Sequence, residues 1–216
     1  MSEFEIDWAR EERTGIAEAI YCEHKTSDQI AAILATTAKR PMLLTRFADE
    51  KFAALPNELR EMLDHDSSSR TAFYQYQRQA LIPGPGIVCA GTSDLPVARE
   101  AQRTLCFYGY RAPLVTDVGV AGLWRLMKRL EEIRSFSIVI AVAGMEGALF
   151  SVLSGLVDTP VIAVPTSVGY GVAAQGHTAL NCALASCAPG LVTVNIDNGF
   201  GAACAALRIV RKMDRS

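Results

Sequence analysis

The feature that most constrains this chain is a series of short apolar runs, spaced roughly 25 residues apart, that begins near residue 86. The runs centre near Ile87, Leu114, Ile138, Val161 and Val192. Unbroken apolar runs of this length are typical of strands that are covered on both faces. A glycine-containing loop and a stretch of helical spacing follow each run, so the pattern predicts an α/β fold with a parallel, doubly wound sheet and right-handed crossovers.

Two of the helical stretches show a clear apolar face. One face is formed by Val97, Ala101 and Leu105, in a helix that is expected to end at Gly109. The other face is formed by Leu123, Leu126, Met127, Leu130 and Ile133. Both faces are expected to cover the sheet.

Residues 1–82 differ in composition, because they hold most of the glutamines and much of the charge. Ser27 opens a helical pattern, and residues 52–63 predict a second amphipathic helix. Asp64, His65 and Asp66 are adjacent and cannot all face one metal ion without an unusual turn, so we expect a solvated loop and no metal site. Residues 80–86 are a Pro- and Gly-rich linker. The sequence therefore predicts a small, mostly helical region over 1–82 and a separate α/β domain over 83–216.

Composition excludes several classes of function. The net charge of -2 and the absence of a basic stripe or zinc-finger spacing argue against nucleic-acid binding. No apolar run reaches the length of a membrane span, and the acidic amino terminus does not resemble a signal peptide, so a cytoplasmic protein is expected. The six cysteines show no Cys-x-x-Cys spacing, which is typical of reduced core thiols.

The loops that leave parallel strands share one edge of the sheet. Here they are residues 91–94, 117–122, 144–147, 165–171 and 197–201. All contain glycine and most contain an acid, which predicts close approach of the backbone to a ligand. Ser93 or Asp94 can cap the helix after the first loop, where amides and the helix N-terminus favour phosphate. No loop matches Gly-x-Gly-x-x-Gly or the lysine phosphate loop, which argues against an ordinary dehydrogenase or NTPase.

Four side chains are candidates for chemistry. Glu146 follows an apolar run and is expected to be poorly solvated, which would raise its pKa and suit a general acid or base, although it could also cap a helix. Asp94 and Asp117 could position a ribose or a proton, or merely cap the next helix. Cys187 lies where a helix ends, and a helix C-terminus disfavours a thiolate, so local reasoning favours a structural thiol.

The motifs in these loops resemble the LarB family of pyridinium-3,5-biscarboxylic acid mononucleotide synthases. The resemblance covers residues 91–98, 117–122, 142–149, 162–171, 186–188 and 194–201, together with 10–15, 20–21 and 25–26. That family is similar over residues 86–210 to PurE, the carboxyaminoimidazole ribonucleotide mutase. The resemblance thus implies that residues 83–216 form a flavodoxin-like, nucleotide-binding catalytic domain, which assembles into a homo-octamer with sites shared between subunits.

The resemblance also implies a reaction: carboxylation of the pyridinium ring of nicotinic acid adenine dinucleotide, with cleavage of the pyrophosphate and release of AMP, on the way to a nickel-pincer cofactor. CO2 or bicarbonate would be the co-substrate and Mg2+ would accompany the phosphates. Cys187 would be the nucleophile and Glu146 the proton-transfer group, against the local interpretation of Cys187, with Asp94 and Asp117 beside ribose and phosphate. The implied substrate contacts are Gly91, Thr92, Ser93, Gly119, Gly144, Met145, Ser167, Val168, Gly169, Tyr170 and Asn198.

The sequence departs from the family pattern at several positions. Trp124 replaces a usual histidine, Phe150 replaces a usual proline, residues 173–178 replace a more glycine-rich segment, and residues 60–80 match poorly. Two alternatives therefore stay open. One is a PurE-like paralogue that carboxylates another pyridine or imidazole nucleotide, and the other is a catalytically silent nucleotide-binding regulator.

Overall fold

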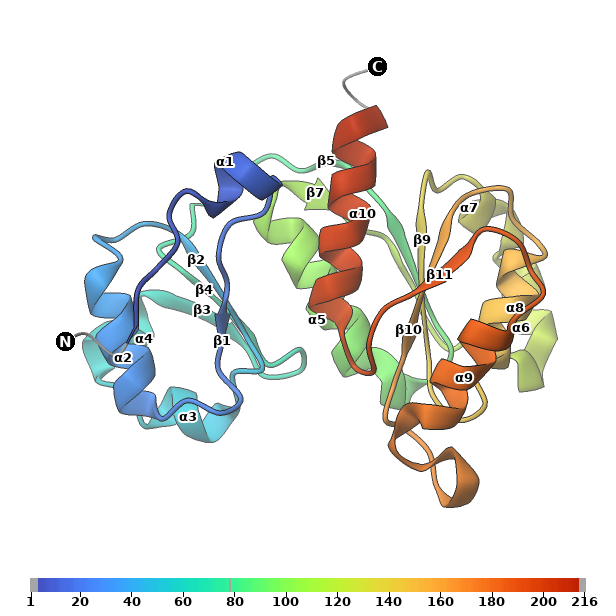
Figure 1. The fold of residues 1–216 in the computed structure, drawn as a ribbon, viewed down its shortest axis with the longest axis horizontal. Coiled ribbons are helices and arrows are strands. Elements are labelled where there is room, and N and C mark those ends of the chain that lie inside the picture. The colour runs from blue at the N-terminus through green and yellow to red at the C-terminus, as the bar shows by residue number, and fades with distance from the viewer. Residues whose placement is uncertain (1–3, 78, 214–216) are drawn as a thin grey trace. The chain divides into compact units, whose positions relative to one another are not determined.

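The computed structural model describes residues 4–77 and 79–213, and the chain divides into two compact units, residues 1–80 and 81–216 (Figure 1). The carboxyl-terminal unit is built on a parallel sheet with strand order β11-β10-β9-β6-β8. Its strands are β6 (Gly86–Cys89), β8 (Leu114–Val115), β9 (Val139–Ala143), β10 (Val161–Pro165) and β11 (Leu191–Thr193). In chain order this is 2-1-3-4-5, the flavodoxin-like arrangement, so the predicted fold class is confirmed.

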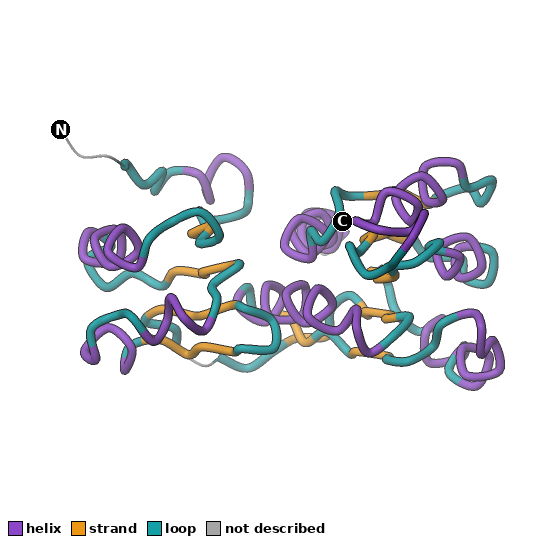
Figure 2. Tube along the Cα trace, turned by 90° about the horizontal axis from the view of Figure 1, so that it is seen from below, coloured by secondary structure: helices purple, strands orange, loops and turns teal. Residues whose placement is uncertain are grey.

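Helices cover both faces of this sheet. α5 (Leu95–Phe107) and α10 (Gly199–Met213) lie on one face and contact each other; α6 (Leu123–Lys128), α7 (Leu130–Arg134), α8 (Ala148–Ser154) and α9 (His177–Ala185) lie on the other (Figure 1). Figure 2 shows helices and strands from below. The loops that leave the strands contain short 3-10 helices: η1 (Thr92–Asp94), η2 (Val120–Gly122) and η3 (Gly171–Gly176). Within the expected linker, β5 (Ile82–Pro83) forms a short strand that pairs with β7 (Tyr110–Arg111), which follows α5.

The buried-strand prediction is confirmed for β6, β9 and β10, in which every residue is buried. It is wrong for β11, which is only partly buried and in which Val192 is 54% exposed. Phe150 on α8 is fully buried in the same core, so this departure from the family pattern is a packing residue. The prediction of a single apolar helix face over residues 123–133 is wrong in part. The helix breaks at Arg129, and Leu123 and Met127 are exposed, because the short α6 presents only Leu126 to the core.

The amino-terminal unit combines helices with a sheet. Its helices are α1 (Arg10–Thr14), α2 (Ser27–Thr36), α3 (Asp49–Ala53) and α4 (Asn57–Glu61), which agrees with the helical expectation. A four-stranded sheet that sequence patterns did not indicate joins them. Its order is β1-β2-β4-β3, from β1 (Ile20–Tyr21), β2 (Met42–Thr45), β3 (Leu63–Asp66) and β4 (Thr71–Tyr74). β1 and β2 are parallel, whereas β4 is antiparallel to both its neighbours.

Two predictions in this unit are wrong. The helix expected over 52–63 is divided into α3 and α4, because Pro56 has no amide hydrogen to continue a helical ladder. The solvated loop expected at Asp64, His65 and Asp66 is the strand β3, which pairs with β4. The His65 ring stacks on Phe52 with ring centroids 4.3 Å apart, and its side chain is only 7% exposed. His65 is therefore a packed residue of this unit.

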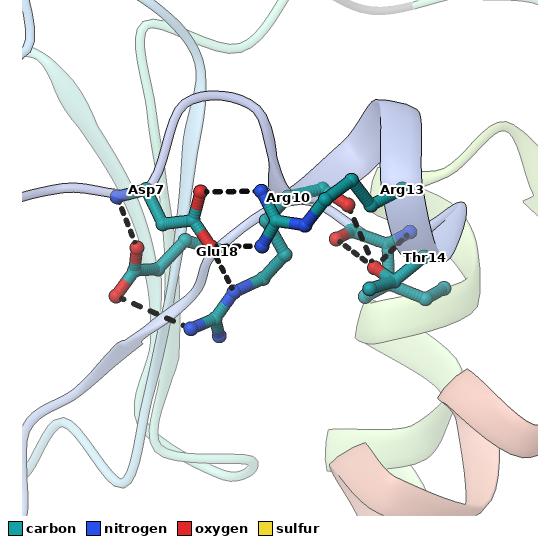
Figure 3. A network of polar contacts seen from close by, with 6 residues as sticks. Asp7, Arg10, Arg13, Thr14 and Glu18 are labelled. Atoms are coloured by element: carbon teal, nitrogen blue, oxygen red, sulfur yellow. Dashed lines mark hydrogen bonds and ion pairs between the residues drawn. The ribbon is translucent and has the colours of Figure 1, made fainter.

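The Arg-Glu-Glu-Arg motif at the amino terminus forms an ion-pair network around Asp7 (Figure 3). Arg13 Nη2 lies 2.6 Å from Asp7 Oδ2, Arg10 Nε lies 3.4 Å from the same oxygen, and the Asp7 amide donates to Glu18. The hydrogen bond from Arg13 holds the pKa of Asp7 below its usual range. The network connects α1 to the segment before β1. Among the described residues, no helix has the length and hydropathy to cross a membrane.

Candidate active site

The loops at the carboxyl ends of the five parallel strands form one edge of the sheet, here called the rim. They are residues 90–94, 116–122, 144–147, 166–176 and 194–198. The strand order reverses between β6 and β9, and at such a point the two loops diverge and leave a crevice for ligands. The rim is therefore the candidate site of this unit.

Asp94 ties three rim loops together. Its carboxylate accepts the hydroxyl of Thr166 at 2.6 Å and the amide of Gly91 at 3.0 Å, and the Gly144 amide also hydrogen-bonds to it. Asp94 is 4% exposed and Thr166 is fully buried. Burial is the main cause that raises the pKa of Asp94, and the three donors oppose it. Asp94 therefore fixes the loops after β6, β9 and β10 relative to one another.

Glycines allow these loops to approach closely. A Cβ on Gly144 would lie 2.3 Å from the Val168 carbonyl oxygen and 2.6 Å from Thr166 Oγ1. Met145 takes a left-handed φ of 52° and its amide donates to the same Val168 carbonyl at 2.7 Å. A Cβ on Gly169 would lie 2.4 Å from the Ala173 carbonyl oxygen, within the loop after β10. The loops after β9 and β10 are thus joined directly.

Most exposed side chains of the rim are polar, although Met145 and Val172 are exposed as well. Thr92, Ser93, Glu146, Ser167 and Tyr170 are all exposed, and Tyr170 is 77% exposed. The expectation that Glu146 is poorly solvated is wrong for a single chain, because the left-handed turn at Met145 carries the next residue away from the core. Hydroxyls and the carboxylates of Glu146 and Asp117 therefore face solvent here, a set of groups suited to a polar ligand.

Asp117 also lies on the exposed rim, next to Gly119. It has a left-handed φ of 58°, and Arg125 Nη1 donates to Asp117 Oδ2 at 2.8 Å. The Gly119 amide donates to the Ala90 carbonyl at 2.8 Å, which joins this loop to the one after β6. Asp117 thus stands beside a cation and does not cap the following helix.

Sequence reasoning missed Thr166 and Asp197. The Asp197 carboxylate accepts the Ser167 amide at 2.8 Å, and its own amide donates to the Pro165 carbonyl. The predicted contact Asn198 caps α10 by accepting the Gly201 amide at 2.8 Å. The available signal was positional: Thr166 and Asp197 each follow a strand-like run, as do the residues that were chosen.

Cys187 lies away from the rim. It follows α9, in the connection that enters β11 at its amino end, whereas Glu146 follows the carboxyl end of β9. Because the strands are parallel, the two residues belong to opposite edges of the sheet. Cys187 is the only exposed thiol among the six cysteines. Burial raises the pKa of Cys22, Cys89 and Cys204 to about 12, which makes those three poor nucleophiles.

The described residues contain no group of three or more His, Cys, Asp or Glu side chains arranged to hold a metal ion. The rim acids Asp94 and Asp117 are engaged by Thr166 and Arg125. Any Mg2+ that accompanies a nucleotide would therefore take most of its ligands from phosphate oxygens and water.

Comparison with known proteins identifies both units. Residues 1–77 match the family model described as LarB/PurE-like N-terminal domain, and residues 86–216 match the model described as AIR carboxylase. An uncharacterized protein of Methanocaldococcus jannaschii is 37% identical over 97% of this chain and 85% of its own length. The N5-carboxyaminoimidazole ribonucleotide mutase of Pyrococcus horikoshii is 33% identical over 59% of this chain and 72% of its own length.

Proposed function

Because the chain belongs to the LarB family, whose carboxyl-terminal part is a PurE-like AIR carboxylase domain, we propose that it carboxylates the pyridinium ring of nicotinic acid adenine dinucleotide and cleaves the pyrophosphate to release AMP. The two matched domains make it an enzyme of the carboxylase or mutase type. Beyond this enzyme class, we propose the substrate, the hydrolytic step and the product.

The observation that carries the proposal is the exposure of Cys187 alone among the six thiols. A pyridinium ring is electrophilic, so the Cys187 thiolate adds to a ring carbon and the electron pair moves to the ring nitrogen. The resulting enamine carbon attacks CO2 and forms the new carbon–carbon bond. A base then removes the proton from that carbon, and expulsion of the thiolate restores the pyridinium ring. Hydrogen is replaced by carboxylate without any oxidant.

Glu146 is the proposed base. It is an exposed rim acid, and the exposed rim hydroxyls of Thr92, Ser93 and Ser167 are suited to hold ribose and phosphate oxygens. Asp94 acts in this proposal by fixing the loops that present these groups. Water attack on the pyrophosphate releases AMP, and Mg2+ held by the phosphates would withdraw charge from the phosphorus atom.

Cys187 and Glu146 occupy opposite edges of one sheet, so the proposed chemistry needs two copies of the chain. In a symmetric oligomer, proposed to be an octamer, the β11 entry loop of one copy would meet the rim of another. This arrangement gives a helix-end thiol a role that it cannot have within one chain.

The direct test is incubation with nicotinic acid adenine dinucleotide, bicarbonate and Mg2+, followed by mass spectrometry. AMP and a dicarboxylated mononucleotide are the expected products, and the dicarboxylated product should be lost in Cys187→Ala. The identity with the Pyrococcus mutase favours one alternative, a PurE-like reaction on an imidazole nucleotide. Turnover of carboxyaminoimidazole ribonucleotide by the wild type, with none of the dinucleotide, would replace the proposal by this alternative. Turnover of neither would favour a regulator.

A further inference from the structure

Trp124 is an exposed aromatic side chain that the proposed reaction does not use. It is the second residue of α6 and is 62% exposed, and Leu123 and Met127 of the same helix are 45% and 48% exposed. These three residues are neighbours on the helix surface, because positions three and four apart lie on one face. Single exposed apolar side chains are common in proteins, whereas a group of adjacent ones marks a surface that contacts another molecule.

The first turn of α6 is tied to the rim. Arg125 Nη1 donates to Asp117 Oδ2 at 2.8 Å, and a Cβ on Gly122 would lie 2.8 Å from Arg125 Nε. The guanidinium therefore packs against the loop after β8. Helical side chains lean toward the N-terminus of their helix, which for α6 is the rim end. Trp124 thus lies beside the rim and leans toward it.

One face of the Trp124 indole ring carries a cation. Lys128 Nζ, one turn farther along α6, lies 4.6 Å from the ring centroid. This cation–π contact restrains the ring. A restrained aromatic ring loses little conformational entropy when a second flat ring stacks on it. Trp124 therefore has the exposure and the order that a stacking surface for a nucleobase requires.

The order of the loops along the rim fits the order of groups in a dinucleotide. β6 lies between β9 and β8, so the loop with Thr92 and Ser93 lies between the loop with Glu146 and the loop that leads to Trp124. At about 4.8 Å between neighbouring strands, the two outer loops leave the sheet about 10 Å apart. A pyridinium ring near Glu146 and a pyrophosphate at Thr92 and Ser93 direct the second base toward Trp124.

We propose that Trp124 is the stacking surface for the adenine base of the dinucleotide. This inference rests on the proposed function, from which it takes the positions of the pyridinium ring and the pyrophosphate. Stacking on an aromatic side chain tolerates any base, because every base has a π-face. The contact therefore selects a substrate that carries a base at this end, and so favours a dinucleotide over a mononucleotide.

The test is fluorescence titration of the Trp8→Phe protein, in which Trp124 is the only tryptophan. The probes are AMP and ribose 5-phosphate, of which only AMP carries a base. AMP should quench Trp124 emission with saturation, and ribose 5-phosphate should not. Calorimetry should find AMP binding about tenfold weaker in Trp124→Leu, as expected for one lost stacking contact. Met127→Gln is the matched control, an exposed apolar residue one turn farther from the rim, and it should bind AMP like wild type.

Kinetics on nicotinic acid adenine dinucleotide separate stacking from a structural role. Trp124→Leu should raise KM about tenfold and leave kcat within about twofold, because the adenine is remote from the reacting ring. Circular dichroism checks folding. A wild type that AMP quenches but that turns over no dinucleotide would reject the proposed reaction and leave the adenine site standing.

Four results would overturn the stacking inference itself. AMP fails to quench Trp124, ribose 5-phosphate quenches it equally, or Trp124→Leu binds AMP like wild type. The fourth is that acrylamide cannot quench Trp124 before nucleotide is added, which would place a second copy of the chain on this surface.

Discussion

Thr166 Oγ1 donates a hydrogen bond to Asp94 Oδ1 over 2.6 Å, and both side chains are buried. The bond connects the residue that follows β10 to the loop that follows β6, so it crosses β9 and spans the point where the strand order reverses. The rim therefore depends on a polar contact inside the protein as well as on its exposed groups.

Replacing Thr166 by valine keeps the side-chain shape and removes the donor. We expect a loss of about 1–3 kcal/mol in the free energy of unfolding, because a buried carboxylate then lacks one partner. Urea unfolding measures this, with Trp124 fluorescence in a Trp8→Phe background reporting on the carboxyl-terminal unit. Thr166→Ser retains the hydroxyl and is the control. Equal stability of the valine and serine variants would show that the hydrogen bond contributes nothing.

Asp94 makes stability depend on pH in a defined direction. Burial raises the pKa of Asp94 in the folded protein, so the folded state holds the proton more tightly than the unfolded state does. Its contribution is fully present below about pH 4, the ordinary aspartate pKa, and is lost as pH rises through the folded pKa. The free energy of unfolding of wild type, relative to that of Asp94→Asn, should therefore fall as pH rises from the ordinary aspartate pKa through the folded pKa of Asp94. Above the folded pKa it should stay constant.

Unfolding midpoints measured from pH 4 to pH 8 check this sign. Thr166→Val should extend the interval to higher pH, since the Thr166 hydrogen bond holds the pKa of Asp94 down. A wild-type advantage that grows with pH would mean that Asp94 is a stabilising charge and not a buried one.

The fold of the carboxyl-terminal unit was readable from sequence because its central strands are unbroken apolar runs buried on both faces, and each loop carries glycine. The amino-terminal sheet was not readable. β1 has two residues, and β3 reads Leu-Asp-His-Asp, whose polar character gives no strand signal. Pairing with β4 and packing of His65 on Phe52, both long-range contacts, decide its structure.

Gly144 should tolerate no side chain. A Cβ there would lie 2.3 Å from a backbone oxygen, so Gly144→Ala must displace the loop after β10, and we expect a cost of about 1–3 kcal/mol or more. Gly155→Ala is the matched control, because its Cβ would meet no atom closer than 3.5 Å and its φ is -82°. That change should be neutral or slightly stabilising. Thermal unfolding compares the two; similar midpoints would contradict the close approach at the rim.

Cys187 should be the first thiol to react with iodoacetamide at pH 8. It is exposed, whereas burial leaves Cys22, Cys89 and Cys204 with a pKa of about 12 and hence a thiolate fraction on the order of one in ten thousand. Peptide mapping after brief labelling should find the adduct on Cys187. The Cys187→Ala variant should lose this fast phase. Faster labelling of Cys106 or Cys182 in wild type would contradict the assignment.

The rim could be located from sequence, but not the partners of its residues. The order of strands and loops identified Asp94, Asp117 and Glu146 as rim acids. Which of them is buried depends on backbone turns, such as the left-handed Met145, and on a threonine distant in sequence. The local sequence pattern indicates neither the turn at Met145 nor the contact with the distant threonine. It therefore predicted poor solvation for Glu146, whereas Asp94 is the buried acid.

Activity should be recovered when two inactive variants of the enzyme are mixed. Cys187 and Glu146 lie at opposite edges of the sheet, so the proposed site takes one residue from each of two chains. In an equal, randomly assembled mixture of Cys187→Ala and Glu146→Gln, half of the sites receive an intact Cys187 and, independently, half receive an intact Glu146. About a quarter of wild-type carboxylation should return, whereas a site built within one chain would return none. Mass spectrometry of product after denaturation and co-refolding measures the recovery. Each variant refolded alone is the control, and a co-assembled mixture that stays inactive rejects the shared site.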